Sequence, residues 1–561
     1  MKYAALILAL LMNVNIGVYA QNSNKYAKYL VILSDKNNNI HEIVHPHTFL
    51  SQRAIERRKT QDINLSQSDL PVNTSYIEGV ARVGAKVRFS SRWFNAIVVE
   101  IAAEGKEKQL EALTALFYVQ EVLPLSQSKR ERKKRNKPLQ GFSIQQNSQM
   151  VTEADAVFYG STFRQINMLA GDFLHANGYT GEGMHVAIID AGFKNADELP
   201  VFDALRERGK LHTGYDFVEG DEDVFDVGST HGTHVFSIMA GNLPGTYVGS
   251  APDADYWLFR TEDASSENLV EEFYWIAAAE FADSVGVDVI NTSLGYTTFD
   301  DPSMNHSYSD LDGNTTYITR AADLAAAKGI LVVSSAGNQG NKPWKHITAP
   351  ADGDSVLTIG AVDSMQTYSS FSSLGPTSDG QIKPDIVGQG TATAYARYTG
   401  SYSVGNGTSY ASPLVAGLAT CLWQANPDRS NMDIIQAIQK SANQYENPDE
   451  FVGYGVPNFY TANLIVAEDP IVDFDEQTIA FAYPNPAMDM INVYYYSVEE
   501  EMVRMELFDA FGRLLMGNET KVLKDAPYRF QFPYWEMLNN GLYFLRIASP
   551  SQQKVLQVIK E

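Results

Sequence analysis

Between residues 184 and 466, apolar runs of strand length alternate with stretches of helical periodicity, and this alternation restricts the fold more than any other feature of the chain. The runs are MHVAIID, DYWLFR, VDVINTSLG, GILVVSSAGN and SVLTIGAV. Strands that are apolar on both faces belong to a parallel sheet with helices on each side. We therefore expect an α/β fold whose parallel sheet is covered by helices on both faces.

Three polar side chains, Asp190, Ser293 and Asn338, close apolar runs of this region. Active sites of such sheets gather at the carboxyl ends of the strands, so we expect the functional site at this edge. The chain has a single cysteine, Cys421, which excludes an internal disulfide and a four-cysteine zinc centre.

A serine suited to nucleophilic catalysis precedes an Ala-rich apolar run. Ser409 lies in GTSYASP and is followed by LVAGLATCLW, which predicts a helix. At a helix start, the backbone N–H of Ser409 and the positive end of the helix dipole would face a developing oxyanion. The same position is typical of a serine that only caps a helix, so this segment alone leaves both roles open.

The histidines restrict which catalytic arrangement is possible, because the last of the ten is His346. No histidine follows Ser409, which excludes the esterase order of serine, acid and histidine for this nucleophile. His231 and His234 lie upstream in STHGTHVFSIMAG, at a spacing that also suits a metal, but zinc lacks an evident third ligand. Asp190, at the end of an apolar strand, is suited to orient an imidazole.

Four blocks in one order, IIDAG, HGTHVFSIMAG, SSAGN and GTSYASPLVAG, resemble the subtilisin-like serine proteases (subtilases) over residues 180–460. The resemblance implies a subtilisin-like fold and makes His234 a structural neighbour. The catalytic residues that it implies are Asp190 as the acid, His231 as the base, Ser409 as the nucleophile and Asn338 as the oxyanion-hole donor.

Two residues beside the expected catalytic residues depart from the pattern of the family. Ala191 follows the acid, where subtilases usually have Thr or Ser, and Tyr410 follows the nucleophile, where they usually have Met. We therefore expect one supporting hydrogen bond fewer at the acid and altered packing beneath the nucleophile.

The resemblance also implies a substrate cleft with two walls. Ser293, Leu294 and Gly295 resemble the strand that pairs with an extended peptide. The opposite wall of the primary specificity pocket would consist of Ser335, Ala336 and Gly337. Small residues in the walls favour large apolar P1 side chains, while the floor of the pocket is not readable from the sequence.

The N-terminal part of the chain predicts export and a separate small domain. Residues 1–20 have the basic start, apolar run and small final residue of a signal peptide. In residues 21–128, a strand, a helix at 51–59, two strands, a helix and a strand indicate an α+β unit that resembles a subtilase propeptide, an inhibitor and chaperone. Residues 129–150, which contain KRERKKRNK, predict a basic linker and processing region before a protease domain at 151–466.

Charge divides the chain near residue 150. Residues 21–150 carry 20 Lys and Arg against 12 Asp and Glu, a net of +8, whereas residues 151–561 carry 22 against 55, a net of −33. This contrast predicts attraction between propeptide and protease. The acidic body argues against nucleic acid as a partner, because phosphate binding needs clustered cations. No stretch after the signal peptide is apolar for long enough to predict a transmembrane span.

The C-terminal part predicts a secretion signal. After an acidic linker at residues 467–477, short alternating strands over 478–561 indicate a small β-sandwich. Its segments YPNPA, FDAFGR and GLYFLRI resemble the type A sorting domain of the type IX secretion system of Bacteroidota. This resemblance implies the type IX machinery as a partner and a secreted or cell-surface location. A generic adhesion module is the alternative.

The resemblance implies no cofactor for the chemistry, although family members often bind structural calcium. Asp310, Asp312 and Asn314 offer alternating oxygen ligands in a Gly-containing loop, and we consider them as weak calcium candidates. An ordinary solvated loop is the alternative.

We therefore expect an exported serine endopeptidase, made as a zymogen, that hydrolyses protein and peptide substrates. Two alternatives remain: a catalytically degenerate protease fold that acts as a surface adhesin or scaffold, and a secreted esterase, which the lack of a downstream histidine disfavours.

Overall fold

The computed structural model describes residues 26–126 and 158–466, and residues 478–560 apart from gaps at 484–485, 488–490, 498, 523–525, 533–534 and 551–552. The predicted signal peptide (1–20) and the predicted linkers (129–150 and 467–477) lie outside the described residues. Contacts within the chain divide it into two compact units, residues 1–467 and residues 468–561.

The centre of the first unit is a seven-stranded sheet in which all neighbouring strands are parallel. Its strands, in order across the sheet, are β13 (Ile386–Gln389), β12 (Val356–Val362), β11 (Leu331–Ser335), β10 (Val289–Thr292), β5 (His185–Asp190), β9 (Asp255–Arg260) and β6 (Leu211–Asp216). Every residue of β10 to β13 is buried, because helices cover both faces. The predicted α/β fold is confirmed.

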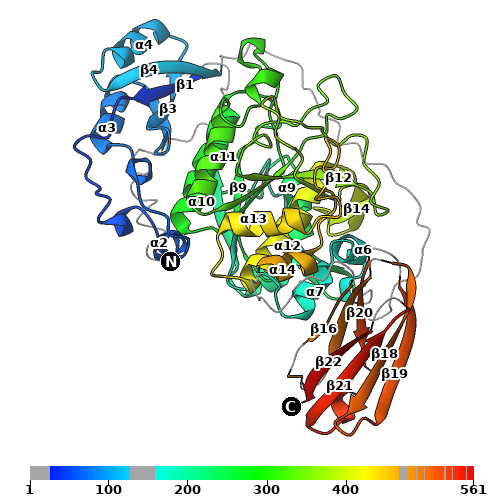
Figure 1. Ribbon diagram of the computed structural model, residues 1–561. Coiled ribbons are helices and arrows are strands. Elements are labelled where there is room, and N and C mark those ends of the chain that lie inside the picture. Colours follow the sequence, from blue (N-terminus) through cyan, green and yellow to red (C-terminus); the bar gives the residue numbers. More distant parts are fainter. Residues whose placement is uncertain are drawn as a thin grey trace. The chain divides into compact units, whose positions relative to one another are not determined.

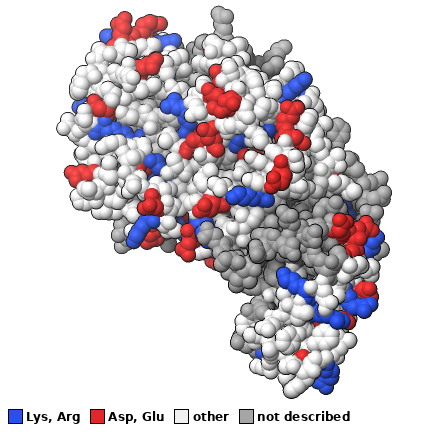
Figure 2. Space-filling view, in the orientation of Figure 1, with Lys and Arg blue, Asp and Glu red and all other residues white. Residues whose placement is uncertain are grey.

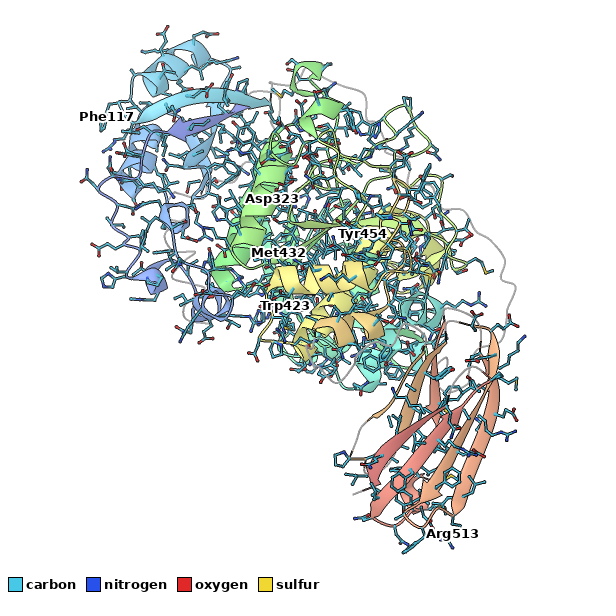
Figure 3. The ribbon with its side chains drawn as sticks, in the orientation of Figure 1. Phe117, Asp323, Trp423, Met432, Tyr454 and Arg513 are labelled. Atoms are coloured by element: carbon cyan, nitrogen blue, oxygen red, sulfur yellow. The ribbon has the colours of Figure 1, made fainter. Side chains whose placement is uncertain are left out.

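Helices of this unit position the site and bury the sheet. Within residues 158–466, the longer helices are α9 (His231–Ala240), α10 (Val270–Val285), α11 (Tyr317–Ala327), α12 (Thr408–Ala425), α13 (Asn431–Lys440) and α14 (Phe459–Val466). Helix α12 packs on β10 to β13 and is buried from Thr408 to Trp423. Helices α10 and α11 run side by side (Figure 1) and share an apolar core with β10 and β11. Figure 3 marks Asp323 on α11 and Met432 on α13.

Shorter elements connect these parts. They are α6 (Phe163–Asn167), α7 (Gly171–Ala176), α8 (Asp203–Glu207), the paired strands β7 (Asn242–Leu243) and β8 (Tyr247–Val248), and the paired strands β14 (Thr393–Ala396) and β15 (Tyr402–Gly405). Asp and Glu are spread over the visible face of the first unit in Figure 2. In the described parts of the chain, no helix is both long and apolar enough to cross a membrane.

Residues 26–126 form an antiparallel sheet within the first unit, with the order β2-β3-β1-β4. Its elements are β1 (Tyr26–Leu33), α2 (Gln52–Thr60), α3 (Thr74–Arg82), β2 (Lys86–Ser91), β3 (Ala96–Ala102), α4 (Lys106–Thr114) and β4 (Val119–Ser126). One face shares a core with α3 and α4. On the other face, Leu30 and Val98 join the apolar cluster that contains α10.

The helix that covers this sheet differs from the predicted one. The predicted helix at 51–59 is confirmed as α2, but α3, which the sequence analysis missed, packs on the sheet. Helix α2 instead buries Arg57 and Arg58 against the protease. Arginine counts as a polar, exposed residue in a hydropathy pattern. The pattern of α2 therefore did not indicate which side of the helix is buried.

The second unit consists of two antiparallel sheets, with the orders β16-β17-β20 and β19-β18-β21-β22. The strands are β16 (Thr478–Tyr483), β17 (Asn492–Ser497), β18 (Glu501–Asp509), β19 (Leu514–Val522), β20 (Ala526–Gln531), β21 (Gly541–Ala548) and β22 (Gln553–Lys560). A common core joins the two sheets through residues such as Val493, Leu507 and Leu545. The predicted β-sandwich is confirmed.

Candidate active site

The aspartate and the histidine singled out in the sequence are joined by a hydrogen bond. Asp190, the last residue of β5, is 1% exposed, and His231 is the first residue of α9. Nδ1 of His231 lies 2.7 Å from Oδ1 of Asp190. A proton held on Nδ1 by this carboxylate makes Nε2 the basic nitrogen of the ring. The pair is therefore arranged to accept a proton at Nε2.

Only one of the two carboxylate oxygens of Asp190 has hydrogen-bond partners among the described residues. Oδ1 also accepts a hydrogen bond from the backbone N–H of Ala191 at 2.7 Å. Oδ2 is buried and has no hydrogen-bond partner among the described residues. Ala191 has no side-chain hydroxyl that could donate to it. A cation that forms beside a buried carboxylate with one unpaired oxygen strongly stabilises the ionised carboxylate.

Ser409 lies at the same edge of the sheet, as the second residue of α12. Its hydroxyl donates to the carbonyl of Ser293 at 3.2 Å, and the hydroxyl of Ser293 donates to the carbonyl of Ser409 at 3.2 Å. The next residue, Tyr410, stacks on His231 with 6.4 Å between the ring centroids. The fold thus brings the serine and the Asp–His pair into one site.

Asn338 follows β11 and is held by the start of α12. Its Oδ1 accepts hydrogen bonds from the backbone N–H of Thr408 at 2.9 Å and from the Thr408 hydroxyl at 3.2 Å. The oxygen end of the amide is thereby fixed, and Nδ2 is the end that can donate. A Cβ at Gly407 would lie 3.7 Å from both Asn338 Nδ2 and the Ser409 nitrogen. Two N–H donors therefore border one small space, where the glycine leaves room for an oxyanion.

His234 has a different environment from His231. Its ring packs 4.2 Å from the ring of Tyr395, and the hydroxyl of Tyr410 lies 3.5 Å from its Nδ1. Burial first, and then the nearby charges of His231 and Arg397, lower the pKa of His234 to about 3. His234 is therefore neutral at physiological pH and packs as an aromatic side chain.

The segments expected to line the substrate cleft leave the sheet side by side. Ser293 to Gly295 follow β10, and Ser335 to Gly337 end and follow β11, its parallel neighbour. Leu294 is half-buried and Gly295 is exposed. The side chain of Thr348 lies between Gly295 and Gly337. The loop at 339–347 brings Thr348 there, and no sequence pattern marks that position.

The weak calcium candidates do not form a set of ligands. Oδ2 of Asp310 accepts from the N–H of Ser307 at 2.7 Å. Oδ1 of Asp312 accepts from the N–H groups of Asn314 and Thr315 at 2.9 and 2.8 Å. These side chains stabilise their own turns, so the arrangement does not fit a calcium ion. In the described parts of the chain, the carboxylates that approach one another closely enough to share a cation are Glu262, Glu267 and Glu271.

A parallel α/β sheet that carries an Asp–His pair, a serine at a helix start and an asparagine amide at one edge defines a serine hydrolase of the Asp–His–Ser class. Residues 181–455 match the Subtilase family. The chain belongs to this family and is a subtilisin-family serine protease with a propeptide.

Similar proteins include several bacterial subtilisins. Subtilisin NAT from Bacillus subtilis subsp. natto is 30% identical over 312 residues, 55% of this chain and 72% of that protein. Subtilisin from Bacillus pumilus is 30% identical over 312 residues, 55% of this chain and 99% of that protein. A crystal structure of MycP1 from Mycobacterium smegmatis matches 53% of this chain and 84% of its own, with 24% identity and a TM-score of 0.42.

Both flanking regions also match known families. Residues 28–140 match the Peptidase S8 propeptide domain of Bacteroidota, and residues 481–561 match a Secretion system C-terminal sorting domain. The sorting domain indicates type IX secretion to the cell surface or the extracellular space, which confirms the predicted location.

Proposed function

We propose that Asp190, His231 and Ser409 are the catalytic triad of this subtilase, with Asn338 as its oxyanion-hole donor. Nε2 of His231 takes the hydroxyl proton as Ser409 Oγ attacks the scissile carbonyl, and Asp190 stabilises the imidazolium. The amide of Asn338 and the N–H of Ser409 donate to the tetrahedral oxygen. The imidazolium then protonates the leaving amine, and water releases the acyl group through the reverse transfers.

The observation that carries this proposal is the 2.7 Å hydrogen bond from His231 to the buried carboxylate of Asp190. It fixes both the tautomer and the orientation of the base. In this structure, which includes the propeptide, the Ser409 hydroxyl donates to the carbonyl of Ser293. Rotation about the Cα–Cβ bond of Ser409 re-aims this hydroxyl when a substrate binds, since catalytic hydrogen bonds commonly tighten only in the complex.

We infer three kinds of partner: protein or peptide substrates, the enzyme's own propeptide, and the type IX secretion machinery. The propeptide inference is supported by Asp283 of α10, which is fully buried. Burial raises its pKa, but the guanidinium groups of Arg58, Arg92 and Arg57 outweigh burial and hold the pKa of Asp283 well below its usual range. All three arginines belong to the propeptide.

The reaction needs no cofactor, as in other subtilisins. Structural calcium is typical of the family. Because Asp310 and Asp312 bind their own turns, no calcium is assigned to that loop.

Casein hydrolysis by the matured enzyme tests the triad. We expect Ser409→Ala to remove nearly all activity, because the nucleophile is lost. Ser401→Ala, at an exposed serine between β14 and β15, is the matched control and should keep wild-type activity. Equal casein cleavage by Ser409→Ala and wild type would show that the nucleophile is another group. Labelling by a fluorophosphonate separates a protease from an inactive scaffold.

A further inference from the structure

An aromatic ring lies beside the imidazole of the proposed general base. The ring centroids of Tyr410 and His231 are 6.4 Å apart, and the two ring planes differ by 27°. This spacing and tilt are typical of offset-stacked rings. Tyr410 is 7% exposed, so its ring is held inside the protein. The imidazole therefore has a carboxylate at Nδ1 and an aromatic ring stacked on it.

Further contacts fix the ring of Tyr410 in this place. Tyr395 of β14 stacks on it, with 5.2 Å between the centroids and 11° between the planes. The ring of Tyr395 also packs 4.2 Å from that of His234, and the Tyr410 hydroxyl lies 3.5 Å from Nδ1 of His234. The orientation of the Tyr410 ring is thus set by residues of both α9 and β14.

A glycine leaves the room that this stack needs. A Cβ placed on Gly405 of β15 would lie 2.6 Å from Cε2 of Tyr410 and 3.0 Å from Cε1 of Tyr395. In a close-packed interior, a side chain at this position would displace both rings. The sequence of β15 is therefore compatible with the stack only because residue 405 has no side chain.

The ionisable groups around the imidazole of His231 come from several elements. Asp190 at the end of β5 is the anion, and its Oδ2 is buried with no hydrogen-bond partner among the described residues. Burial raises the pKa of Tyr410, so its hydroxyl stays protonated. His234 is neutral, since burial first, and then the charges of His231 and Arg397, lower its pKa to about 3. An imidazolium on His231 thus gains from a stabilising contact besides Asp190.

We propose that Tyr410 is a positioning residue for the general base. Its ring holds the imidazole of His231 against Asp190, and the negative face of the ring stabilises the imidazolium that forms during turnover. This inference rests on the proposed function of the site. The ring replaces the Met that subtilases usually have at this position, and Ala191 replaces their usual hydroxyl. The ring thus supports an imidazolium whose carboxylate has one hydrogen bond fewer.

Kinetics of two Tyr410 variants on a peptide substrate test this proposal, with each mature enzyme normalised by fluorophosphonate titration of its active sites. We expect Tyr410→Leu to lower kcat about 3- to 10-fold with little change in KM, because the ring stabilises the imidazolium and not the bound substrate. The acidic limb of kcat/KM against pH should move to lower pH by about half a unit, because loss of the ring disfavours the charged base. Tyr410→Phe keeps the ring and should stay within about 2-fold of wild type.

An unchanged kcat in Tyr410→Leu would overturn the proposal. So would a lower kcat whose acidic limb stays in place or moves to higher pH, because that result indicates a loosened site. An equal loss in Tyr410→Phe would also overturn it, since the effect would then belong to the hydroxyl.

If Tyr410→Leu does not mature, Gly405→Ala displaces the ring while every residue of the proposed triad is kept. It should show the same lower kcat and the same shift of the acidic limb, and an unchanged pH profile would overturn the proposal. Gly228→Ala is the matched control at the wild-type rate, since no atom lies within 4 Å of its Cβ position. Casein hydrolysis by a wild-type enzyme that does not react with the fluorophosphonate would contradict the triad itself, and this proposal with it.

Discussion

At the scale of single residues, one buried oxygen of the proposed triad has no hydrogen-bond partner among the described residues, namely Oδ2 of Asp190. Such exceptions in a folded protein call for an explanation. For Asp190, we propose that the explanation is the imidazolium that forms on His231 during turnover. The sequence predicted Asp190, His231 and Ser409 as candidates from the order of their motifs, and the structure joins Asp190 and His231 by a hydrogen bond. The position of Thr348 between Gly295 and Gly337 could not be predicted, because only the folded loop brings it there.

Asn338 gives a prediction for activity. Asn338→Ala removes the Nδ2 donor beside Gly407. Loss of the corresponding donor in subtilisin lowers kcat about 10²–10³-fold, and we carry this magnitude over to the present chain. Steady-state kinetics on a peptide substrate should show lower kcat with little change in KM. A change in KM alone would mean that Asn338 only binds substrate.

His234 gives a prediction for acid stability. Its pKa is about 3 in the folded protein, against an ordinary value of 6.5. Between these pH values the unfolded chain therefore binds more protons than the folded protein does. The contribution of neutral His234 to the free energy of unfolding is complete above pH 6.5 and decreases as the pH falls towards 3. The slope is at most about 1.4 kcal/mol per pH unit.

Replacing His234 should therefore reduce acid sensitivity. In a Ser409→Ala background, which prevents self-digestion, we expect His234→Gln to lose less stability than its parent between pH 6.5 and pH 4.5. Urea unfolding at the two pH values measures the difference. An identical loss in both proteins would contradict the buried neutral state of His234.

At the scale of secondary structure, continuous apolar runs predicted the parallel strands correctly because both faces of the sheet are covered. The propeptide helices were harder to assign. Helix α2 docks by polar contacts: Arg53 Nε donates to the carbonyl of Gly286 at 2.9 Å, and Gln61 Nε2 donates to the carbonyl of Gly329 at 2.8 Å. These glycines follow the C-terminal ends of α10 and α11. Because α2 docks on helix ends through polar groups, its sequence shows no hydrophobic periodicity.

Gly286 tests this docking. It has φ +88°, and a Cβ there would lie 2.7 Å from the nitrogen of Ala54 in α2. Gly209, with φ +68° and no atom within 4 Å of its Cβ position, is the matched control. Both alanine variants carry left-handed strain of roughly 1–2 kcal/mol, but only Gly286→Ala also displaces α2. Urea unfolding of the Ser409→Ala precursor should show a larger loss for Gly286→Ala, and equal losses would contradict the α2 interface.

At the scale of the whole molecule, propeptide and protease are joined by buried ion pairs. Asp283 pairs with Arg58 at 2.8 Å and also with Arg57 and Arg92. Buried pairs of this kind are screened by salt much less than exposed ones. The sequence predicted the attraction from net charge, but not that one carboxylate would bind three arginines.

Asp283→Asn should therefore destabilise the precursor. The change leaves three guanidinium groups without their shared counter-charge, and loss of one partner of a buried ion pair costs about 3–5 kcal/mol. Asp203→Asn is the control, since Asp203 forms an exposed pair with Arg206 whose loss costs about 0–1 kcal/mol. Urea unfolding of both variants in the Ser409→Ala precursor measures the difference, and similar small losses would contradict the buried network.

The proposed triad is tested most directly by mapping the covalent adduct of a fluorophosphonate on the mature enzyme by mass spectrometry. We predict a single adduct, on Ser409, whose formation slows by orders of magnitude in His231→Ala because the base is gone. An adduct on another residue, or labelling of His231→Ala at the wild-type rate, would contradict the triad.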